Sequence, residues 1–454
     1  MTSAPPPQLR NLSLGAIFAL AVIALFAVVL VVPGDGSRTG GGGSAAAGAD
    51  EGSRCRGRLC PPLAGDRVHV GAERLLVDSL HLVAGKRVGL ITNHTGIVGP
   101  AGPAAGETEL ISTVDVLHGA PGVELAALFG PEHGLRGDAE AGVGVQDGVD
   151  VRTGIPVYSL YGAVRRPTPE SLSGLDVLLF DMQDVGARYY TYVYTMALAM
   201  EAAGELGIPF VVLDRPNPVG AAMQGNILSS GFESFVGMYP VPMRHGMTAG
   251  ELARAYVGEF GIEVELSVVP LQGWRREMTY SETGLSWTAP SPNMPSEESA
   301  LAYSGTCLFE GTPLSVGRGT ESAFQVIGAP WLDGRELAER LNAYGIAGVR
   351  FEAVRFTPGA PGDGKFDGTE LGGVRFVAIE AEFDAPRAAV AALIEARALS
   401  GDDWSWREGH FDRLAGTDSL RLGVEAGSDL DEITGSWDGG ISEFRARIQD
   451  YLLY

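Results

Sequence analysis

The stretch from Phe129 to Asp138, FGPEHGLRGD, decides how this sequence is interpreted. It ends a mostly apolar run, Val123 to Phe129, which has the length and composition of a buried strand. Glycine and proline then stop that strand and permit a tight turn. Two carboxylates, an imidazole and a guanidinium follow within seven residues, from Glu132 to Asp138. Ligands of open α/β sheets bind in the crevice beyond the carboxyl ends of the strands, so this loop is a candidate functional site.

Several other strands are predicted to end in the same way. Apolar runs at 87–91, 155–160, 177–180 and 210–213 are each followed by polar residues, and helical segments alternate with them. Continuous apolar strands of this kind predict a parallel sheet covered on both faces. One charged loop alone is as well explained by solvation, but polar groups after several parallel strands collect along one rim. The sequence therefore predicts an α/β fold with an open, Rossmann-like parallel sheet.

The phosphate-binding motifs of such sheets are missing. No G-x-G-x-x-G follows the first strand, and no G-x-x-x-x-G-K occurs anywhere in the chain. We predict helices near 71–83, 110–118 and 192–206, and a further helix that begins at Thr168. The motifs therefore do not indicate a dinucleotide or nucleotide triphosphate as ligand.

The pattern changes beyond about residue 225. Thr248 and Glu251 form a capping-box pair that predicts a helix over 249–260. The segment 287–295 contains three prolines and cannot hold a regular strand. Later strands are expected at 349–356 and 374–381, with helices near 334–341, 386–399 and 442–452. We predict a Rossmann-like catalytic domain at 65–300, followed by a smaller auxiliary α+β domain at 301–454.

Composition limits the classes of partner. The chain has 454 residues, 45% of them hydrophobic and 20% charged, which is typical of a globular protein with full cores. Its formal net charge is −23, and no basic cluster or nucleic-acid-reading motif occurs. We therefore exclude nucleic acid as a partner. The only lysines are Lys86 and Lys365.

The N-terminus predicts export. Leu14 to Val32 is an unbroken apolar run that follows Arg10 and is long enough to cross a bilayer as a helix. A cleaved signal peptide has a shorter apolar region with a small-residue cleavage site close behind it. We therefore favour residues 1–33 as a signal anchor that holds the body outside the cytoplasmic membrane, and secretion after cleavage is the alternative.

Residues 34–64 are predicted to form a flexible linker, because the first part is rich in Gly, Ser and Ala. Cys55 and Cys60 flank a short loop there, and in an exported protein such a pair indicates a disulfide. Cys307 lies in an apolar context without an evident partner, so we predict a buried free thiol.

The sequence gives little support for a metal site or for a catalytic serine. The seven histidines are scattered without the spacing of metal-ligand motifs, and a site built from His133, His245 and Asp214 would need a coincidence of the fold. The G-x-S-x-G elbow of serine hydrolases is absent. We predict no metal and no cofactor.

What remains is an excess of carboxylates in apolar or glycine-bounded contexts: Glu132, Asp181, Asp184, Asp214, Glu310 and Glu321. Glycoside hydrolysis uses one protonated acid and one ionised partner, which such environments can provide. Nearby aromatic residues can stack on sugars, although core packing is the alternative for each: Tyr161, Tyr189, Tyr190, Tyr192 and Trp287. Three arginines can hold a substrate carboxylate in bidentate fashion, with structural pairing as the alternative: Arg188, Arg244 and Arg318.

Eight phrases of this sequence together resemble one bacterial family, which includes the exo-acting β-N-acetylmuramidases of the NamZ type. They are GLITNHTG (89–96), FGPEHG (129–134), FDMQDVGAR (180–188), LDRPNP (213–218), RHGMT (244–248), PSPNMP (290–295), EGT (310–312) and GRGT (317–320). The resemblance extends from about residue 65 to the end in the same order. It implies a cleft between two domains and removal of terminal N-acetylmuramic acid from the non-reducing end of peptidoglycan fragments.

The resemblance also implies roles for individual residues. Glu132 matches the glutamate of P-E-H-G and is expected to be the general acid, and Glu310 is expected to be the second carboxylate or a substrate ligand. The residues expected to bind substrate are Asn93, His133, Asp184, Arg188, Tyr190, Asn217, Arg244, His245, Asn293 and Arg318. The chain departs from the family pattern at His94, at 313–317 and at Glu321, which leaves the sugar preference open.

The leading hypothesis is therefore an exported glycosidase of cell-wall turnover that acts on muropeptides or disaccharides. The alternatives are a non-catalytic cell-wall-sugar binding protein and a hydrolase of another bond on the same scaffold. The sequence leaves open whether configuration is retained or inverted, because that depends on the separation of the two carboxylates in space. It also leaves the oligomeric state open.

Overall fold

The computed structural model describes residues 67–99, 110–131, 135, 147–162, 164–380 and 383–454, and these form part of one compact unit, Gly52–Tyr454. Several predictions fall outside the described residues: the anchor Leu14 to Val32, the Cys55–Cys60 disulfide, Glu132 and His133. Among the helices that are described, none is both long and apolar enough to cross a membrane. Cys307 is a buried free thiol, as predicted.

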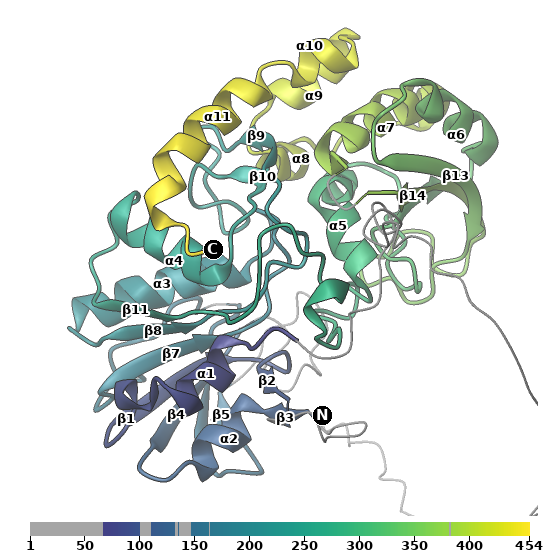
Figure 1. The fold of residues 1–454 in the computed structure, drawn as a ribbon. Helices are drawn as coiled ribbons and strands as arrows, with labels where there is room; N and C mark the ends of the chain where they lie inside the picture. The colour runs from purple at the N-terminus through teal and green to yellow at the C-terminus, as the bar shows by residue number, and fades with distance from the viewer. Residues whose placement is uncertain (1–66, 100–109, 132–134, 136–146, 163, 381–382) are drawn as a thin grey trace, which may run out of the picture. The chain divides into compact units, whose positions relative to one another are not determined.

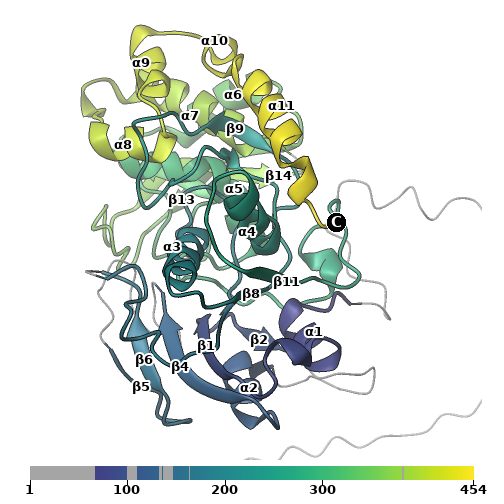
Figure 2. The same ribbon diagram turned by 90° about the vertical axis from the view of Figure 1, so that its left-hand side faces the viewer.

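A seven-stranded sheet forms the centre of the first domain (Figures 1 and 2). Neighbouring strands pair in parallel, except that β5 is antiparallel to β6. Read in chain order, the six parallel strands follow the doubly wound order 3-2-1-4-5-6, so the winding direction reverses between β1 and β7. The predicted α/β fold with a mostly parallel sheet is confirmed. In spatial order the strands are β11 (Leu266–Val269), β8 (Phe210–Leu213), β7 (Val177–Asp181), β1 (Arg87–Thr92), β4 (Glu124–Gly130), β6 (Pro156–Ser159) and β5 (Gly148–Val149).

Alternate residues of the strands enter two separate apolar cores. Along β7, Val177 and Leu179 belong to one core, and Leu178 and Phe180 belong to the other. Successive side chains of a strand point to opposite faces, and helices cover both faces here. Figures 1 and 2 show helices on both faces, and their buried residues belong to different cores. One face has α1 (Gly71–Val77) and α2 (Thr113–Gly119), and the other has α3 (Tyr192–Glu205) and α4 (Ala249–Gly258).

Local signals placed some helices well and failed at others. The capping box of Thr248 and Glu251 starts α4 as predicted. The helix predicted from Thr168 is wrong: the segment makes one turn, because Gly174 adopts a left-handed φ of 75° and β7 begins shortly afterwards. The helix predicted near 110–118 starts later than expected, because Ile111–Ser112 (β3) pairs with Ile97–Val98 (β2).

The smaller second domain is confirmed, and it is built on a three-stranded antiparallel sheet with the order β12-β14-β13. The strands are Val326–Ala329 (β12), Val349–Phe356 (β13) and Leu371–Ala378 (β14). The helices α5 (Glu297–Thr306), α6 (Gly334–Ala343) and α7 (Ala385–Ser400) pack with this sheet or with one another. The predicted domain boundary at residues 300 and 301 falls inside α5 and stays a prediction.

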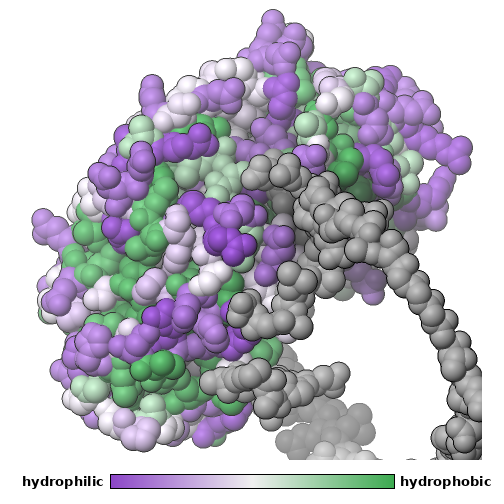
Figure 3. Space-filling model, viewed as in Figure 1, coloured by the Kyte–Doolittle hydropathy of each residue, from purple (hydrophilic) through white to green (hydrophobic). Residues whose placement is uncertain are grey.

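Hydrophilic residues are dense over α6, α9 and α10 (Figure 3).

The last helices return to the first domain. One of the two apolar cores continues from α3 and α4 into α7, α8 and α11, so the two domains share it. Helix α11 packs against β9, which pairs with β10. The sequence predicted α7 and α11 but not α8, α9 or α10. The remaining elements are β9 (Gln224–Ile227), β10 (Pro242–Arg244), α8 (Glu408–Ala415), α9 (Ser419–Ala426), α10 (Leu430–Thr434) and α11 (Trp437–Ile448).

Tyr454 fastens the end of the chain to the first domain, beside α4 (Figure 1). Its hydroxyl donates to Asp214 Oδ2 at 2.8 Å and accepts from the Leu271 N–H at 2.7 Å. Burial raises the pKa of Asp214 to about 6, although donors that include the Gly250 N–H and the Thr248 hydroxyl favour its ionised form. The C-terminal segment thus depends on a buried carboxylate at the edge of the central sheet.

The change Tyr454→Phe removes one donor from this carboxylate and leaves the Leu271 N–H without its acceptor. We expect a loss of about 1–3 kcal/mol in the free energy of unfolding. The folded pKa of Asp214, about 6, exceeds its ordinary value of 3.8, so its titration stabilises the fold at low pH, and this contribution disappears as the pH rises through 6. Because the Tyr454 hydroxyl supports the ionised form, the loss in Tyr454→Phe should be larger above pH 6 than below it. Urea unfolding on both sides of this pH checks the prediction, and an equal loss on the two sides would contradict it.

Candidate active site

The loops that follow β1, β4, β7 and β8 lie at the same edge of the sheet, because these strands are parallel. They bring Asn93, Pro131, Gln183 and Asp214 to that edge, and the winding direction reverses between the first and third of these loops. Ligands bind at such a switch point in doubly wound sheets. The predicted rim of polar groups is therefore present.

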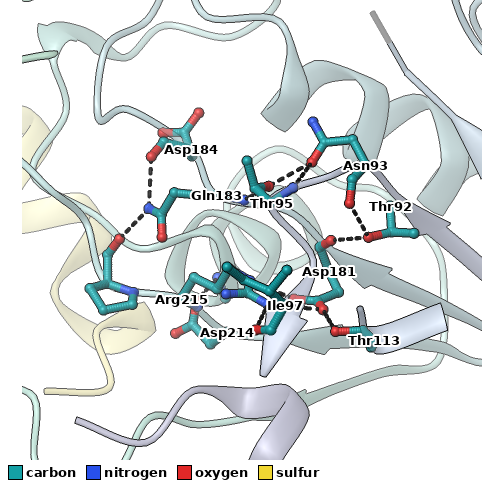
Figure 4. A network of polar contacts seen from close by, with 12 residues as sticks. Thr92, Asn93, Thr95, Ile97, Thr113, Asp181, Gln183, Asp184, Asp214 and Arg215 are labelled. Carbon is teal, nitrogen blue, oxygen red and sulfur yellow. Dashed lines mark hydrogen bonds and ion pairs between the residues drawn. The ribbon is translucent and has the colours of Figure 1, made fainter. Parts of the chain in front are cut away.

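A buried ion pair joins the loops of this rim (Figure 4). Arg215 Nε donates to Asp181 Oδ1 at 2.6 Å, and its Nη2 donates to Oδ2 at 3.1 Å. The hydroxyl of Thr113, at the start of α2, also donates to Oδ2, at 2.6 Å. Asp181 is fully buried and Arg215 nearly so. Burial alone would lower the pKa of Arg215, but the Asp181 carboxylate outweighs this and raises it.

Asn93 presents a fixed donor at this rim. Its Oδ1 accepts from the N–H and the hydroxyl of Thr95, at 2.9 and 2.6 Å, which fixes the orientation of the amide. The Thr95 hydroxyl in turn accepts from the Gln183 N–H at 2.9 Å. Asn93 Nδ2 is buried, hydrogen-bonds to none of the described residues, and points away from the network in Figure 4. A buried amide donor without a partner suits a substrate acceptor.

The proline-rich segment 287–295 connects this rim to the second domain. His94 Nε2 lies 2.7 Å from the carbonyl oxygen of Ala289. The hydroxyl of Tyr192, at the start of α3, donates to the carbonyl of Pro290 at 2.7 Å. The segment contains no strand, as its prolines predicted, and side-chain contacts rather than a ladder hold it.

Glu310 and Arg318 form an ion pair on the second domain. Both Nε and Nη2 of Arg318 donate to Glu310 Oε1, at 2.7 and 2.5 Å. Glu310 belongs to the short 3-10 helix Cys307–Gly311, and each side chain of the pair is about one-fifth exposed. Burial alone would lower the pKa of Arg318, but Glu310 outweighs this and raises it. Asn293 accepts from the Gly319 N–H at 3.2 Å, so the proline-rich segment contacts the turn that carries Arg318.

Contacts between aromatic rings lead from Tyr192, which binds the proline-rich segment, to the Glu310–Arg318 pair. The ring centroids of Tyr190 and Tyr192 lie 4.8 Å apart, and those of Tyr190 and Tyr303 lie 6.0 Å apart. Tyr303 packs against Phe324, whose ring lies 5.1 Å from the Arg318 guanidinium carbon. A continuous series of contacts thus links several predicted site residues: Asn93, Tyr190, Asn293, Glu310 and Arg318.

Arg188 has a different environment from the predicted one. It is fully buried, and its guanidinium donates to four carbonyl oxygens at 2.7–3.2 Å. Two of these carbonyls, those of Leu414 and Ala415, are at the C-terminal end of α8, where a helix lacks internal partners. Burial lowers the pKa of Arg188. Arg188 thus joins the second domain to the first, and its binding of substrate stays a prediction.

Other predicted ligands also make contacts inside the protein. His245 Nδ1 accepts from the Met247 N–H at 3.2 Å, and Nε2 lies 3.4 Å from Asp184 Oδ2, but among the described residues Nε2 has no hydrogen-bond partner. Asn217 donates to the carbonyl of Met247 at 2.9 Å. Arg244 is 1% exposed and donates to Gln224 and to backbone carbonyls. The structure gives these residues supporting contacts behind the rim.

Glu132 and His133 lie outside the described residues. Strand β4 ends at Gly130, and both Pro131 and Leu135 are buried. A cavity of about 370 Å³ lies beside this strand end, lined by residues that include Ser159 and Tyr161. Ser159 pairs with Gly130 in the sheet register, so the cavity is next to the end of β4.

A larger cavity of about 680 Å³ lies elsewhere, between the start of α5, β14 and the segment 276–282. Of the predicted site residues, it is lined only by Arg244. In the part of the chain that the structure describes, no group of three or more His, Cys, Asp or Glu side chains could hold a metal ion.

Some residues of the rim network were not selected from the sequence. Arg215, Thr95, Gln183 and Tyr303 were absent from the predicted site. Strand β8 ends at Leu213, and Arg215 comes two residues later, after Asp214. Asp181 is the last residue of the neighbouring strand β7. An arginine and an aspartate at the ends of adjacent parallel strands are a signal that could have identified this pair.

The fold defines a doubly wound α/β protein with a rim of polar groups at its switch point and a smaller second domain. Family models described as the N-terminal and C-terminal parts of exo-β-N-acetylmuramidase NamZ match residues 88–298 and 301–454. The chain belongs to the NamZ family.

Relatives and solved structures support this assignment over nearly the same span. The peptidoglycan β-N-acetylmuramidase NamZ of Bacillus subtilis (strain 168) is 45% identical over 391 residues, which cover 86% of this chain and 92% of the relative. A crystal structure of a DUF1343 family protein from Bacteroides fragilis NCTC 9343 has a TM-score of 0.78 and 36% identity, and covers 86% of this chain and 100% of its own. A second such protein from that organism has a TM-score of 0.69 and 32% identity, with coverages of 85% and 99%.

The change Arg215→Met leaves the Asp181 carboxylate buried without its counter-charge. Breaking one partner of a buried pair costs about 3–5 kcal/mol, so the free energy of unfolding should fall by that amount. Denaturant unfolding measures the loss. The exposed pair Arg355–Glu370 provides a matched control, since Arg355→Met should cost less than about 1 kcal/mol. Equal losses at the two sites would contradict a central role for Asp181 and Arg215.

Arg188→Met should also destabilise the protein, because it leaves four carbonyl groups without their donor. We expect a loss of about 2–5 kcal/mol, and KM for substrate should stay unchanged in the folded fraction. Arg188→Lys retains the charge but loses the planar set of guanidinium donors, so it should recover only part of the stability. A stable Arg188→Met protein with a raised KM would restore the substrate role instead.

Proposed function

We propose that this protein is an exo-acting glycoside hydrolase that releases terminal N-acetylmuramic acid from the non-reducing ends of peptidoglycan fragments. The observation that carries this proposal is the 45% identity to a peptidoglycan β-N-acetylmuramidase along 92% of that relative. Both domains take part in that match, so the rim of the sheet and the Glu310 segment are included together.

Glu132 is the general acid in this proposal, and Glu310 is the second carboxylate. In the sequence Glu132 follows Gly130, the last residue of β4, by two positions, and ligands of this class of fold bind beyond the carboxyl ends of the strands. Arg318 stays charged and holds Glu310 by two hydrogen bonds, and a carboxylate held in this way suits a base, a nucleophile or an electrostatic partner. The acid would protonate the glycosidic oxygen while the ionised carboxylate assists the attack on the sugar, directly or through water.

Recognition of the sugar would use groups that the fold leaves available. Asn93 Nδ2 offers a buried, oriented donor for an acceptor on the sugar. Arg318 uses Nε and Nη2 on Glu310, and a guanidinium has five N–H donors, so it retains donors for the lactyl carboxylate of muramic acid. The cavity of about 370 Å³ beside β6 has the volume of a small-ligand site, and Tyr161 in its lining offers an aromatic face.

We also propose that the enzyme works outside the cytoplasmic membrane. The support is the apolar run Leu14 to Val32, which follows Arg10 and precedes a linker rich in Gly and Ser. Muropeptides or disaccharides from the cell wall would then reach the site without crossing the membrane. Membrane attachment through this run is favoured, and secretion after cleavage is the alternative.

Glu132→Gln should retain the fold and lower turnover of a chromogenic β-N-acetylmuraminide by roughly 10²–10⁴-fold, because it removes the proton donor. Glu321→Gln is the matched control, since Glu321 is exposed and lies outside the predicted site. Release of chromophore measures both. Near wild-type turnover in a folded Glu132→Gln protein would remove Glu132 from this role. Binding without release by the wild type would favour a sugar-binding protein, and inhibition by chelators would favour hydrolysis of another bond.

A further inference from the structure

Lys365 is an unusual residue in this chain. The sequence contains 33 Lys and Arg residues, and only Lys86 and Lys365 are lysines. Lys365 belongs to the loop between β13 and β14, residues 357–370, on the second domain. Its side chain is not solvated at the surface, as a lysine on a loop ordinarily is, but inserted into the protein.

The ammonium of Lys365 is enclosed by backbone carbonyls around Glu310. Nζ donates to the carbonyl oxygens of Leu314 at 2.8 Å, Thr312 at 2.9 Å and Phe309 at 3.2 Å. The carbonyl of Glu310 itself lies at 3.5 Å. An ammonium has three donors on one compact atom, and these suit three converging acceptors. A planar guanidinium could not direct its N–H groups to the same three oxygens, which accounts for a lysine at this position.

The same loop also contacts the partner of Glu310. The Gly359 N–H donates to the carbonyl of Gly319, directly after Arg318, at 3.2 Å. Residue Phe366 has a left-handed φ of 57°, which is strained for a bulky side chain. Strain of this kind persists where surrounding contacts determine the conformation. Here those contacts are the Lys365 bonds and the packing of Phe366 on Trp331, with ring centroids 5.7 Å apart.

We propose that Lys365 is a positioning residue: its ammonium fixes the backbone of residues 309–314 and so directs the Glu310 carboxylate, held by Arg318, toward the sugar. This inference rests on the proposed function, in which Glu310 is the second carboxylate. Lys365 itself touches no substrate. Its effect on turnover passes entirely through the direction of Glu310.

The charges around Lys365 make this arrangement sensitive to pH. Burial lowers the pKa of Lys365 to about 8; Asp363 and Glu310 oppose the shift, and Arg407 and Arg318 add to it. Other titratable groups in this region are His410 on α8, whose pKa is lowered by burial, and Cys307, whose pKa is raised by burial. Above pH 8 the amine is neutral and has one donor fewer for its three carbonyls. Turnover should therefore decline as the pH rises through about 8, while the fold persists.

The test compares Lys365→Met and Lys365→Ala with Lys86→Met and Lys86→Ala. Lys86 directly precedes β1, at the amino end of the strand and so at the edge opposite the rim, which makes it a matched control. A catalytic group displaced by about 1 Å can cost roughly 10²-fold in rate, so both Lys365 variants should lose kcat on that order with little change in KM. Lys365→Arg should show a loss of kcat like that of Lys365→Met, because a planar guanidinium cannot reach the same three carbonyls. The change to Ala removes a propylammonium group, so added n-propylammonium should raise both kcat and Tm of Lys365→Ala and neither value in Lys86→Ala.

The outcomes separate this inference from the proposed function. A wild type that releases no chromophore overturns the proposed function, and the positioning of a catalytic Glu310 with it. An active wild type with unchanged kcat in both Lys365 variants overturns the positioning alone. A rise in Tm without a rise in kcat on adding n-propylammonium also overturns it, because it indicates a purely structural bond. If neither variant folds, Lys365→Arg decides: a lower kcat with unchanged KM and Tm supports the inference, and an unchanged kcat overturns it.

Discussion

The ion pair of Asp181 and Arg215 is the interaction on which the functional edge of this protein depends. It lies beside the place where the sheet reverses its winding direction, and it joins the ends of β7 and β8 to the start of α2 through Thr113. The end of β1 is also joined to this point, because the Thr92 hydroxyl donates to the Asp181 carbonyl at 2.7 Å. A buried pair is costly to break, so the loops that leave these strands have fixed starting points. Asn93 can therefore present its amide in one direction without help from a ligand.

The second domain uses buried cations for a related purpose. Arg188 satisfies the open carbonyls at the end of α8, and Lys365 satisfies those around Glu310. Among the described residues, neither cation has a carboxylate as its hydrogen-bond partner. Each instead converts unpaired backbone acceptors into a fixed contact between segments far apart in the sequence. The carboxylate at Glu310 and the domain contact at Arg188 thus rest on the same chemistry, a charged donor that meets several carbonyls.

Local patterns predicted the strands of the central sheet well, because strands buried on both faces are continuous apolar runs. They also placed the polar rim, since the carboxyl ends of parallel strands share one edge. The site was predicted less evenly. The series of contacts that the structure describes includes Asn93, Glu310 and Arg318, whereas Arg188 and Arg244 are buried in carbonyl contacts. The carbonyl groups that Arg188 contacts include those of Leu414 and Ala415, more than 220 residues further along the chain, so no pattern local to an arginine could tell which guanidinium they would occupy.

The sequence by itself determined the fold class, the family and the residue types available for chemistry. These follow from local runs and phrases, and each can be recognised without knowing what packs against it. Only the tertiary structure decided which polar groups are free and which are taken. Thr95 holds the oxygen of the Asn93 amide, and within the described part of the chain the amide nitrogen has no partner. Lys365 lies at Glu310 because the β13–β14 loop folds back over residues 309–314. Such partners are distant in sequence, and hydrogen-bond satisfaction is a property of the packed chain rather than of any segment in it.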